Sequence, residues 1–313
     1  MKSNPAVAEM SSSQPTVSLE HVTKKFGDFT AVNDLSLSVR AGRIYGLIGP
    51  NGAGKTTTIR MLVNITAPDS GVIKLFGQEM DGKTQDRIGY LPEERGLYRK
   101  MRISDQLLFF GELKDFKGKQ ARDAVDRWME RMDLVEWKSK KAETLSKGMQ
   151  QKIQFIAAVI HDPDMLILDE PFSGLDPINM ELLKEIVRDF KAAGKTIIFS
   201  THLMELAEKI CDDICLINRS QKVLEGSLRD VKSSFGSNRV ALRAEGGHSV
   251  LGDKSLVTRV KNQSDEIELL LADGVDPQIV LRRLIESGAL ITKFELVEPT
   301  LHEIFIEKVR GSA

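Results

Sequence analysis

The feature that most constrains the fold is a glycine-rich loop between an apolar run and a helix-forming segment. The apolar run is Ile44–Ile48, and the segment after the loop leads into Met61 and Leu62. The loop and the first residues after it are Gly49, Pro50, Asn51, Gly52, Ala53, Gly54, Lys55, Thr56 and Thr57. Two glycines that bracket four residues and precede Lys and Thr form the phosphate-loop pattern. The sequence therefore predicts a strand, a loop and a helix within an α/β fold.

This loop has the chemistry of a nucleoside triphosphate site. Gly52 and Gly54 let backbone N–H groups turn inward, and the following helix directs its positive end toward the same point. Lys55 adds a full charge near the outer phosphates, and the Thr56 hydroxyl is suited to Mg²⁺. The alternative is a glycine-rich turn that binds nothing. We favour nucleotide binding because a strand precedes the loop and a helix follows it.

Two carboxylates end a second apolar run, Met165–Leu168, and are followed by Pro171. Ionised groups at the end of a buried strand are costly unless a cation meets them, and Mg²⁺ held by Thr56 is a natural partner. Neighbouring residues of a strand face opposite ways, so Asp169 and Glu170 should have different roles. We expect Asp169 to bind the metal and Glu170 to act as general base toward the attacking water. A charged strand end that only meets solvent is the alternative.

Patterning along the chain predicts the architecture of two domains. Alternating apolar and polar residues over Val17–Val39 predict antiparallel strands, whereas residues 104–139 have the spacing of helices. We expect an α/β fold with a parallel sheet core, an antiparallel β subdomain and a helical insert at about residues 97–145. This nucleotide-binding domain should span residues 17–230, between a flexible leader at 1–16 and a small C-terminal α+β domain at 231–313. Residues 233–237, Ser-Ser-Phe-Gly-Ser, are typical of a linker.

Composition excludes several other classes of protein. The chain has 313 residues and a net charge of −1, which argues against a generally basic nucleic-acid binder, so we expect no nucleic-acid partner. Its longest apolar stretch, Phe155–Ile160, is far shorter than the roughly 18 residues that a membrane-spanning helix needs. The N-terminus lacks the basic and apolar regions of a signal peptide, so we expect a cytoplasmic protein. Cys211 and Cys215 lack partners for a metal or redox site, and we expect both to be core residues.

Further motifs resemble those of ATP-binding cassette (ABC) transporter ATP-binding subunits over nearly all of residues 17–227. Leu145-Ser146-Lys147-Gly148-Met149-Gln150 resembles the family's signature, and Ser173-Gly174-Leu175-Asp176 resembles the loop after its second carboxylate motif. Ser200-Thr201-His202 matches the switch histidine, and Phe26 stands where the family places an aromatic ring against adenine. Each motif alone has an ordinary structural alternative: Ser146 and His202 as helix caps, and Phe26 as a core residue. Their shared order along the chain favours the family.

The resemblance implies a mechanism that needs two chains. Two cassettes would close head to tail around two ATP, as a homodimer or a heterodimer, with Phe26 at adenine and Ser146 and Gly148 of the partner at the γ-phosphate. His202 would contact the γ-phosphate region, and Asp176 would link the two sites. Closure would drive separate integral membrane subunits, docked near Glu93 and the helical insert. The protein would then lie peripherally on the inner face of the cell membrane.

Two departures from the family pattern refine this expectation. Glu93 stands where the family usually has a glutamine, and it could still reach the metal or the attacking water. The signature has Lys147 and Met149 where Gly and Gln are commoner. This variant resembles bacterial export-type subunits with an extra C-terminal domain, which favours an exporter. The alternative is a soluble ABC ATPase that acts on ribosomes or DNA. A phosphate-loop GTPase or kinase is a weaker rival, because the guanine-reading Asn-Lys-x-Asp motif is missing. The C-terminal domain could dimerise, sense a ligand, contact the membrane partner or simply stabilise the chain.

Overall fold

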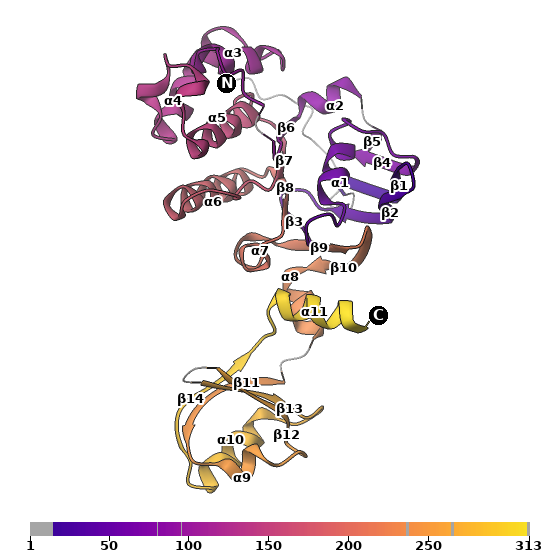
Figure 1. The fold of residues 1–313 in the computed structure, drawn as a ribbon, viewed down its shortest axis with the longest axis vertical. Helices are drawn as coiled ribbons and strands as arrows, with labels where there is room; N and C mark the ends of the chain where they lie inside the picture. The colour runs from indigo at the N-terminus through magenta and orange to yellow at the C-terminus, as the bar shows by residue number, and fades with distance from the viewer. Residues whose placement is uncertain (1–14, 80, 95, 236–237, 264–265, 312–313) are drawn as a thin grey trace. The chain divides into compact units, whose positions relative to one another are not determined.

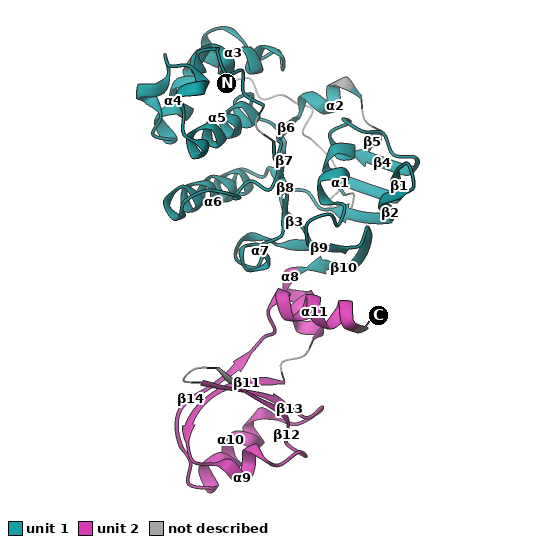
Figure 2. Ribbon diagram, viewed as in Figure 1, with its two compact units in different colours: residues 1–227 teal, residues 228–313 magenta. Residues whose placement is uncertain are grey.

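The chain folds into two compact units, which Figure 2 shows in different colours. The computed structural model describes residues 15–79, 81–94, 96–235, 238–263 and 266–311. The first unit ends at Ser227 and the second begins at Leu228. Most of the expected leader lies outside the described residues, but Thr16 is part of the fold. Its N–H donates to the carbonyl of Val39, and its own carbonyl accepts from Phe76.

A six-stranded sheet forms the centre of the first unit. In spatial order its strands are β10 (Gln221–Ser227), β9 (Asp213–Asn218), β3 (Ile44–Ile48), β8 (Thr196–Thr201), β7 (Met165–Asp169) and β6 (Ile88–Leu91). All neighbours are parallel except β10, which pairs with β9 in the antiparallel direction. Every residue of β3, β7 and β8 is buried, as expected for parallel strands covered on both faces.

A second, antiparallel sheet packs its apolar side chains into the same core. Its strands lie in the order β2 (Phe29–Val39), β1 (Val17–Phe26), β4 (Ser70–Leu75) and β5 (Gln78–Glu79). Val17, Leu19 and Leu35 share one buried cluster with Tyr45 of β3 and Ile59 of the first helix. This packing ties the antiparallel sheet to the strand and the helix that flank the glycine-rich loop.

Helices cover both faces of the central sheet. They are α1 (Lys55–Leu62), α2 (Gly82–Asp86), α6 (Pro177–Ala192) and α7 (Met204–Ile210). Figure 1 shows this sheet edge-on, with α6 on one side and α1 on the other. Asp176 caps α6 by accepting from the N–H of Asn179 at 3.0 Å, and Pro177 occupies the first turn, where its missing N–H costs nothing.

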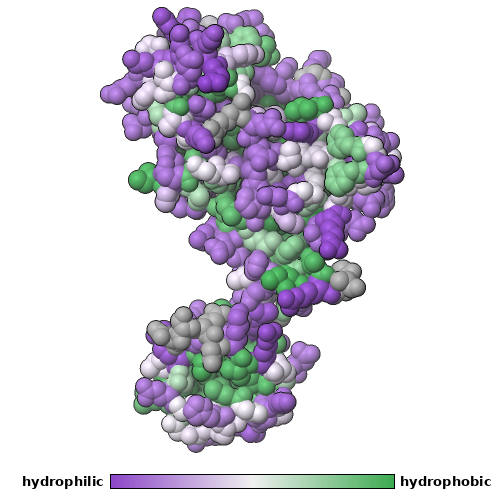
Figure 3. Space-filling view, viewed as in Figure 1, coloured by the Kyte–Doolittle hydropathy of each residue, from purple (hydrophilic) through white to green (hydrophobic). Residues whose placement is uncertain are grey.

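The expected helical insert lies between β6 and β7. It contains α3 (Ile103–Glu112), α4 (Gly118–Arg131) and two short 3₁₀ helices at Val135–Trp137 and Ala142–Thr144. Helix α5 (Lys147–Val159) begins just after the expected insert and leads to β7. The buried residues of α4 follow helical spacing and are Ala121, Ala124, Val125 and Met129. The remaining side chains of α4 are mostly charged, and in Figure 3 the surface around α3 and α4 is largely hydrophilic.

The second unit has its own sheet and core. It contains α8 (Leu228–Ser234), β11 (Arg239–Glu245), α9 (His248–Leu251), β12 (Val257–Gln263), β13 (Glu266–Leu271), α10 (Pro277–Glu286), β14 (Leu290–Val297) and α11 (Leu301–Gly311). The sheet is antiparallel with the order β12-β13-β11-β14. From β11 to β14 this is the split β-α-β topology of ferredoxin-like domains. Val240, Leu242 and Leu269 pack against Val280 and Leu284 of α10.

The structure confirms the expected fold class and corrects one local expectation. Ser233 and Ser234, which we expected in a linker, belong to α8, and residues 236–237 lie outside the described residues. Cys211 and Cys215 are free and buried, as core residues should be. None of the described helices combines the length and the apolar composition needed to cross a membrane.

Candidate functional site

The glycine-rich loop takes a shape that the surrounding backbone imposes. A Cβ atom at Gly49 would lie 2.1 Å from the carbonyl oxygen of Ile217, and one at Gly54 would lie 2.4 Å from that of Ala31. Gly54 also has φ of 108°, in the region that disfavours other residues. Because glycine has no Cβ atom, the loop can pass close to these carbonyl oxygens and turn tightly into α1. The N-terminus of α1 then faces the space beside the loop.

Lys55 is held back over this loop. Its Nζ donates to the carbonyl oxygens of Gly49 at 2.9 Å and Pro50 at 3.2 Å, and its side chain is 6% exposed. Glu170 Oε1 lies 3.5 Å from the same Nζ. A buried ammonium group with these partners is positioned to meet an anion, because it already lies at the loop and is shielded from solvent.

A cavity of about 390 Å³ lies beside the loop. The loop and the first turn of α1 supply Asn51, Gly52, Gly54, Lys55, Thr56 and Thr57 to its wall. Glu93, Glu170 and Phe29 also line it. The structure thus brings together residues from four distant parts of the sequence, around a space of the size of a ligand site.

Asp169 lies at the base of this site with one oxygen unused. Its Oδ1 accepts from Ser200 Oγ at 2.5 Å and from Thr56 Oγ1 at 3.2 Å. Among the described residues, its buried Oδ2 has no hydrogen-bond partner. Burial raises the pKa of the Asp169 carboxyl above its ordinary value. A buried carboxylate oxygen without a donor, next to a threonine hydroxyl, fits a hard cation such as Mg²⁺.

Glu170 points toward both Lys55 and His202. Its Oε1 is 3.0 Å from His202 Nδ1, and its N–H donates to Ser200 Oγ at 3.0 Å. Its φ of 48° is rare for a residue with a side chain, and such conformations cluster at functional sites. The neighbouring carboxylates therefore differ in environment: Asp169 bonds to hydroxyl groups, whereas Glu170 faces the cavity beside a histidine and a lysine.

Several expected site residues lie elsewhere in the chain. Ser146 is exposed and caps α5 by accepting from the N–H of Met149 at 3.3 Å. Asp176 is exposed as the cap of α6, and its pKa is lowered by the hydrogen bond from the backbone of Asn179. Gly148 follows Ser146 in the first turn of α5. None of these three lines the cavity beside the glycine-rich loop.

The structure also adds a residue that the sequence motifs did not indicate. Phe29 lines the cavity, whereas the expected adenine contact, Phe26, does not. The two are directly opposite in the β1–β2 hairpin, so their side chains share a face of the sheet. Their spacing across a Gly-Asp turn is the only signal in the sequence that could have linked them.

This fold and this site define a phosphate-loop nucleotide-binding protein, and comparison with known families narrows the class. Residues 32–173 match the family model of ABC transporters, and residues 226–309 match the model described as "ATP-binding protein DrrA1-3-like, C-terminal domain". The chain belongs to the ATP-binding proteins of ABC transporters, and it is an ABC transporter ATPase. As such it binds ATP and acts with membrane subunits.

Relatives and solved structures agree with this family. The chain is 44% identical to an uncharacterized ABC transporter ATP-binding protein, YhaQ of Bacillus subtilis, over 94% of this chain and 98% of that protein. It is 38% identical to Nod factor export ATP-binding protein I of Burkholderia lata, over 73% of this chain and 79% of that protein. A solved ATP-binding subunit of an ABC transporter superposes with a TM-score of 0.67 at 28% identity, covering 71% of this chain and 93% of that one.

Proposed function

We propose that this protein hydrolyses Mg²⁺-bound ATP in a head-to-tail dimer and thereby drives export through separate membrane subunits. The observation that carries the proposal is that Lys55 and Glu170 line one cavity together with Thr56, whose hydroxyl donates to Asp169. Several relatives at 35–38% identity are named as Nod factor export proteins, which supports export as the direction of transport.

The base of ATP would lie against the aromatic pair at the β1–β2 hairpin. Phe29 lines the cavity, and Phe26 extends the same surface from the paired position. The phosphates would follow the loop from Gly49 to Thr57, including Pro50, Asn51 and Ala53, toward the N-terminus of α1. Lys55 would move its hydrogen bonds from the carbonyl oxygens of the loop to the outer phosphates.

Thr56 and Asp169 would hold Mg²⁺, with Glu93 facing the same cavity. The described residues contain no group of three His, Cys, Asp or Glu side chains able to hold a metal ion, so phosphate oxygens and water must complete its ligands. Mg²⁺ bound there would neutralise charge on the phosphates. The carboxylate of Glu93 has a charge that the usual glutamine lacks, and we propose that it contributes to this cation site.

Glu170 would accept the proton of the water that attacks the γ-phosphate. His202 Nδ1 lies 3.0 Å from Glu170 Oε1, so it would orient this carboxylate, with the imidazole ring beside the γ-phosphate region. Because Glu170 also lies 3.5 Å from Lys55, arrival of the nucleotide would replace this ion pair with a phosphate–lysine contact. Glu170 would thereby become available as a general base.

The second chain would complete each site. Ser146 and Gly148 lie outside the cavity of their own chain, at the exposed N-terminus of α5, where backbone N–H groups can meet a γ-phosphate. Asp176 is exposed at the start of α6 and would link the two sites. A Cβ atom at Gly148 would meet nothing within 4 Å, so its lack of a side chain is explained best by close approach of another molecule.

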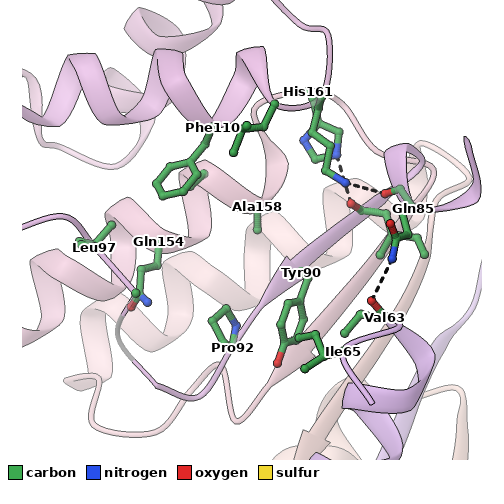
Figure 4. A pocket seen from close by; sticks show the side chains of 15 residues that line it. Val63, Ile65, Gln85, Tyr90, Pro92, Leu97, Phe110, Gln154, Ala158 and His161 are labelled. Carbon is green, nitrogen blue, oxygen red and sulfur yellow. Dashed lines mark hydrogen bonds between the residues drawn. The ribbon is translucent and has the colours of Figure 1, made fainter. Parts of the chain in front are cut away.

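The membrane subunit would dock in an apolar groove between the helical insert and the central sheet. This groove has a volume of about 390 Å³ and is shown in Figure 4, with Leu97 and Phe110 on the insert side and Tyr90 and Pro92 at the end of β6. It lies next to Glu93, so a partner seated there could sense the nucleotide site. The protein would then be peripheral on the cytoplasmic face of the cell membrane.

Co-purification tests this proposal. A tagged Glu170→Gln chain is loaded with ATP and Mg²⁺ and purified from membranes extracted in mild detergent. A polytopic membrane protein should co-purify with it in stoichiometric amount and be identified by mass spectrometry. Adding Phe110→Asp should reduce the recovery of that protein, whereas Val135→Asp, at a 57% exposed position of the same insert, should not. Recovery of ribosomal or DNA-bound partners, or of no partner, would contradict the transporter assignment.

A further inference from the structure

The sheet of the second unit has one apolar face and one charged face. Val240, Leu242 and Leu269 point into the core with α9 and α10, whereas the alternate residues Arg239 and Glu268 point to the other face. Figures 1 and 2 show α10 and α11 on different sides of this sheet. Helix α11 therefore lies over the charged face of the sheet, and α10 lies over the apolar face.

A cavity of about 330 Å³ lies between this charged face and α11. Strands β11 to β13 contribute Arg239, Arg259, Lys261 and Glu268, and α11 contributes Glu303 and Arg310. All of these residues belong to the second unit. The cavity is therefore a property of that unit, independent of the nucleotide site.

Part of the charge in this cavity is already balanced. Arg239 Nη1 lies 3.2 Å from Glu268 Oε1 and 3.0 Å from Glu303 Oε2, and these side chains are 18%, 21% and 28% exposed. Lys261 Nζ lies 3.9 Å from Glu268 and 4.0 Å from Glu303. The carboxylates of Glu268 and Glu303 thus balance the charges of Arg239 and Lys261. We call these four side chains the pair network of the cavity.

Two guanidinium groups remain without such compensation. Arg259 on β12 and Arg310 on α11 line the cavity, and neither makes an ion pair with another described residue. The one other acid of the lining, Glu307, is not ion-paired within the described part of the chain either. The lining therefore has a surplus of one positive charge, and Leu270 and Ile306 provide apolar surface beside it.

We infer that this cavity binds a small phosphate-bearing ligand, with the phosphate between Arg259 and Arg310. Guanidinium groups form charge-assisted, often bidentate hydrogen bonds with phosphate, and the non-bridging oxygens of a phosphate monoester or diester can accept from two of them at once. The neutral pair network around Arg239 would orient the polar part of the ligand, while Leu270 and Ile306 would contact its carbon atoms. A soluble phosphorylated metabolite and a phospholipid headgroup share this chemistry.

The test uses the full chain with its nucleotide site saturated by Mg²⁺-ADP, so that the phosphate loop does not bind the probe. Calorimetry with sn-glycerol 3-phosphate and with inorganic phosphate reports a soluble ligand. Co-sedimentation with vesicles containing phosphatidylglycerol reports a lipid headgroup. Binding in either experiment should weaken about tenfold or more in Arg259→Gln and again in the Arg259→Gln/Arg310→Gln double variant, because each change removes a charged hydrogen-bonding group.

The control is Arg282→Gln, which removes the same charge from an exposed position on α10. This variant should bind as the wild type does, and the urea midpoints of all variants should agree, because Arg259 and Arg310 make no ion pairs with described residues. The inference is overturned if neither probe binds, if the double variant binds as tightly as the wild type, or if Arg282→Gln loses as much affinity.

Discussion

No contact within the single chain explains why position 148 is a glycine. It lies in the first turn of α5, its φ is not in the left-handed region, and a Cβ atom there would have open space around it. Gly49 and Gly54 differ, because neighbouring backbone atoms exclude a Cβ at both positions. We therefore attribute Gly148 to an intermolecular contact and Gly49 and Gly54 to the fold of the loop.

Replacing Gly148 by Ala should raise the stability of the chain and lower its rate of ATP hydrolysis. Alanine favours helical backbone, so the free energy of unfolding should rise by about 0.5 kcal/mol in a urea titration. The added methyl group would intrude on the nucleotide of the partner, so the rate of ATP hydrolysis should fall by about tenfold or more. Higher stability with an unchanged rate of hydrolysis would contradict this role for Gly148.

We expect the aromatic pair Phe26 and Phe29 to contribute to the affinity for ATP. Stacking of a base on an aromatic ring contributes about 1–3 kcal/mol, so Phe29→Ala should raise the Kd of a fluorescent ATP analogue by about tenfold. We expect Phe26→Ala to act in the same direction. Leu290→Ala, at an exposed apolar position of the second unit, is the control. If neither phenylalanine variant binds more weakly, the base lies elsewhere.

At the scale of elements, β6 and the end of α5 place a histidine where protonation is unfavourable. His161 Nε2 lies 3.3 Å from the carbonyl oxygen of Ile88, and His161 lines the apolar groove. Burial, and then the positive charge of Lys114, lower the pKa of His161 to about 4. The unfolded chain therefore binds a proton that the folded chain excludes at mildly acidic pH.

This linkage predicts the dependence of stability on pH. The stabilisation is complete above the ordinary histidine pKa of about 6.5 and is lost as the pH falls toward 4, by up to roughly 3 kcal/mol. His161→Gln should flatten the curve of unfolding free energy between these values, while His302→Gln, at an exposed position, should not. Trp128 and Trp137 both lie in the helical insert, so their fluorescence reports the first unit during urea unfolding. Parallel curves for wild type and His161→Gln would contradict the prediction.

Elements with a strong local signal could be predicted from the sequence, and elements defined by long-range contacts could not. The buried runs of β3 and β7 and the loop between β3 and α1 are visible because apolar runs and glycine spacing are local. α8 was missed because Ser233 and Ser234 favour turns over helices in isolation. The contribution of Phe29 depends on the hairpin register, and the cavity near Arg259 and Arg310 depends on β12 and α11, which are far apart in the sequence.

At the scale of the whole molecule, our proposal requires one chain to supply two separated parts of an ATP site. The loop and Glu170 line one cavity, with Asp169 bonded to Thr56 of its wall, whereas Ser146, Gly148 and Asp176 do not line it. This division is the structural basis for our proposal that two chains close around two ATP molecules. We propose that Glu170 is the residue at which binding and hydrolysis can be uncoupled, because it contacts Lys55 and His202 without forming part of the loop.

The most direct measurement is the molar mass of Glu170→Gln with Mg²⁺ and ATP, by size-exclusion chromatography with light scattering. The account predicts retained ATP affinity, loss of hydrolysis and an ATP-dependent shift from one chain to two. The Glu170→Gln/Lys55→Ala double variant should lose ATP binding and stay a monomer, which separates closure from nonspecific association. A Glu170→Gln chain that hydrolyses ATP as the wild type does, or that binds ATP and remains a monomer, would contradict the central claim.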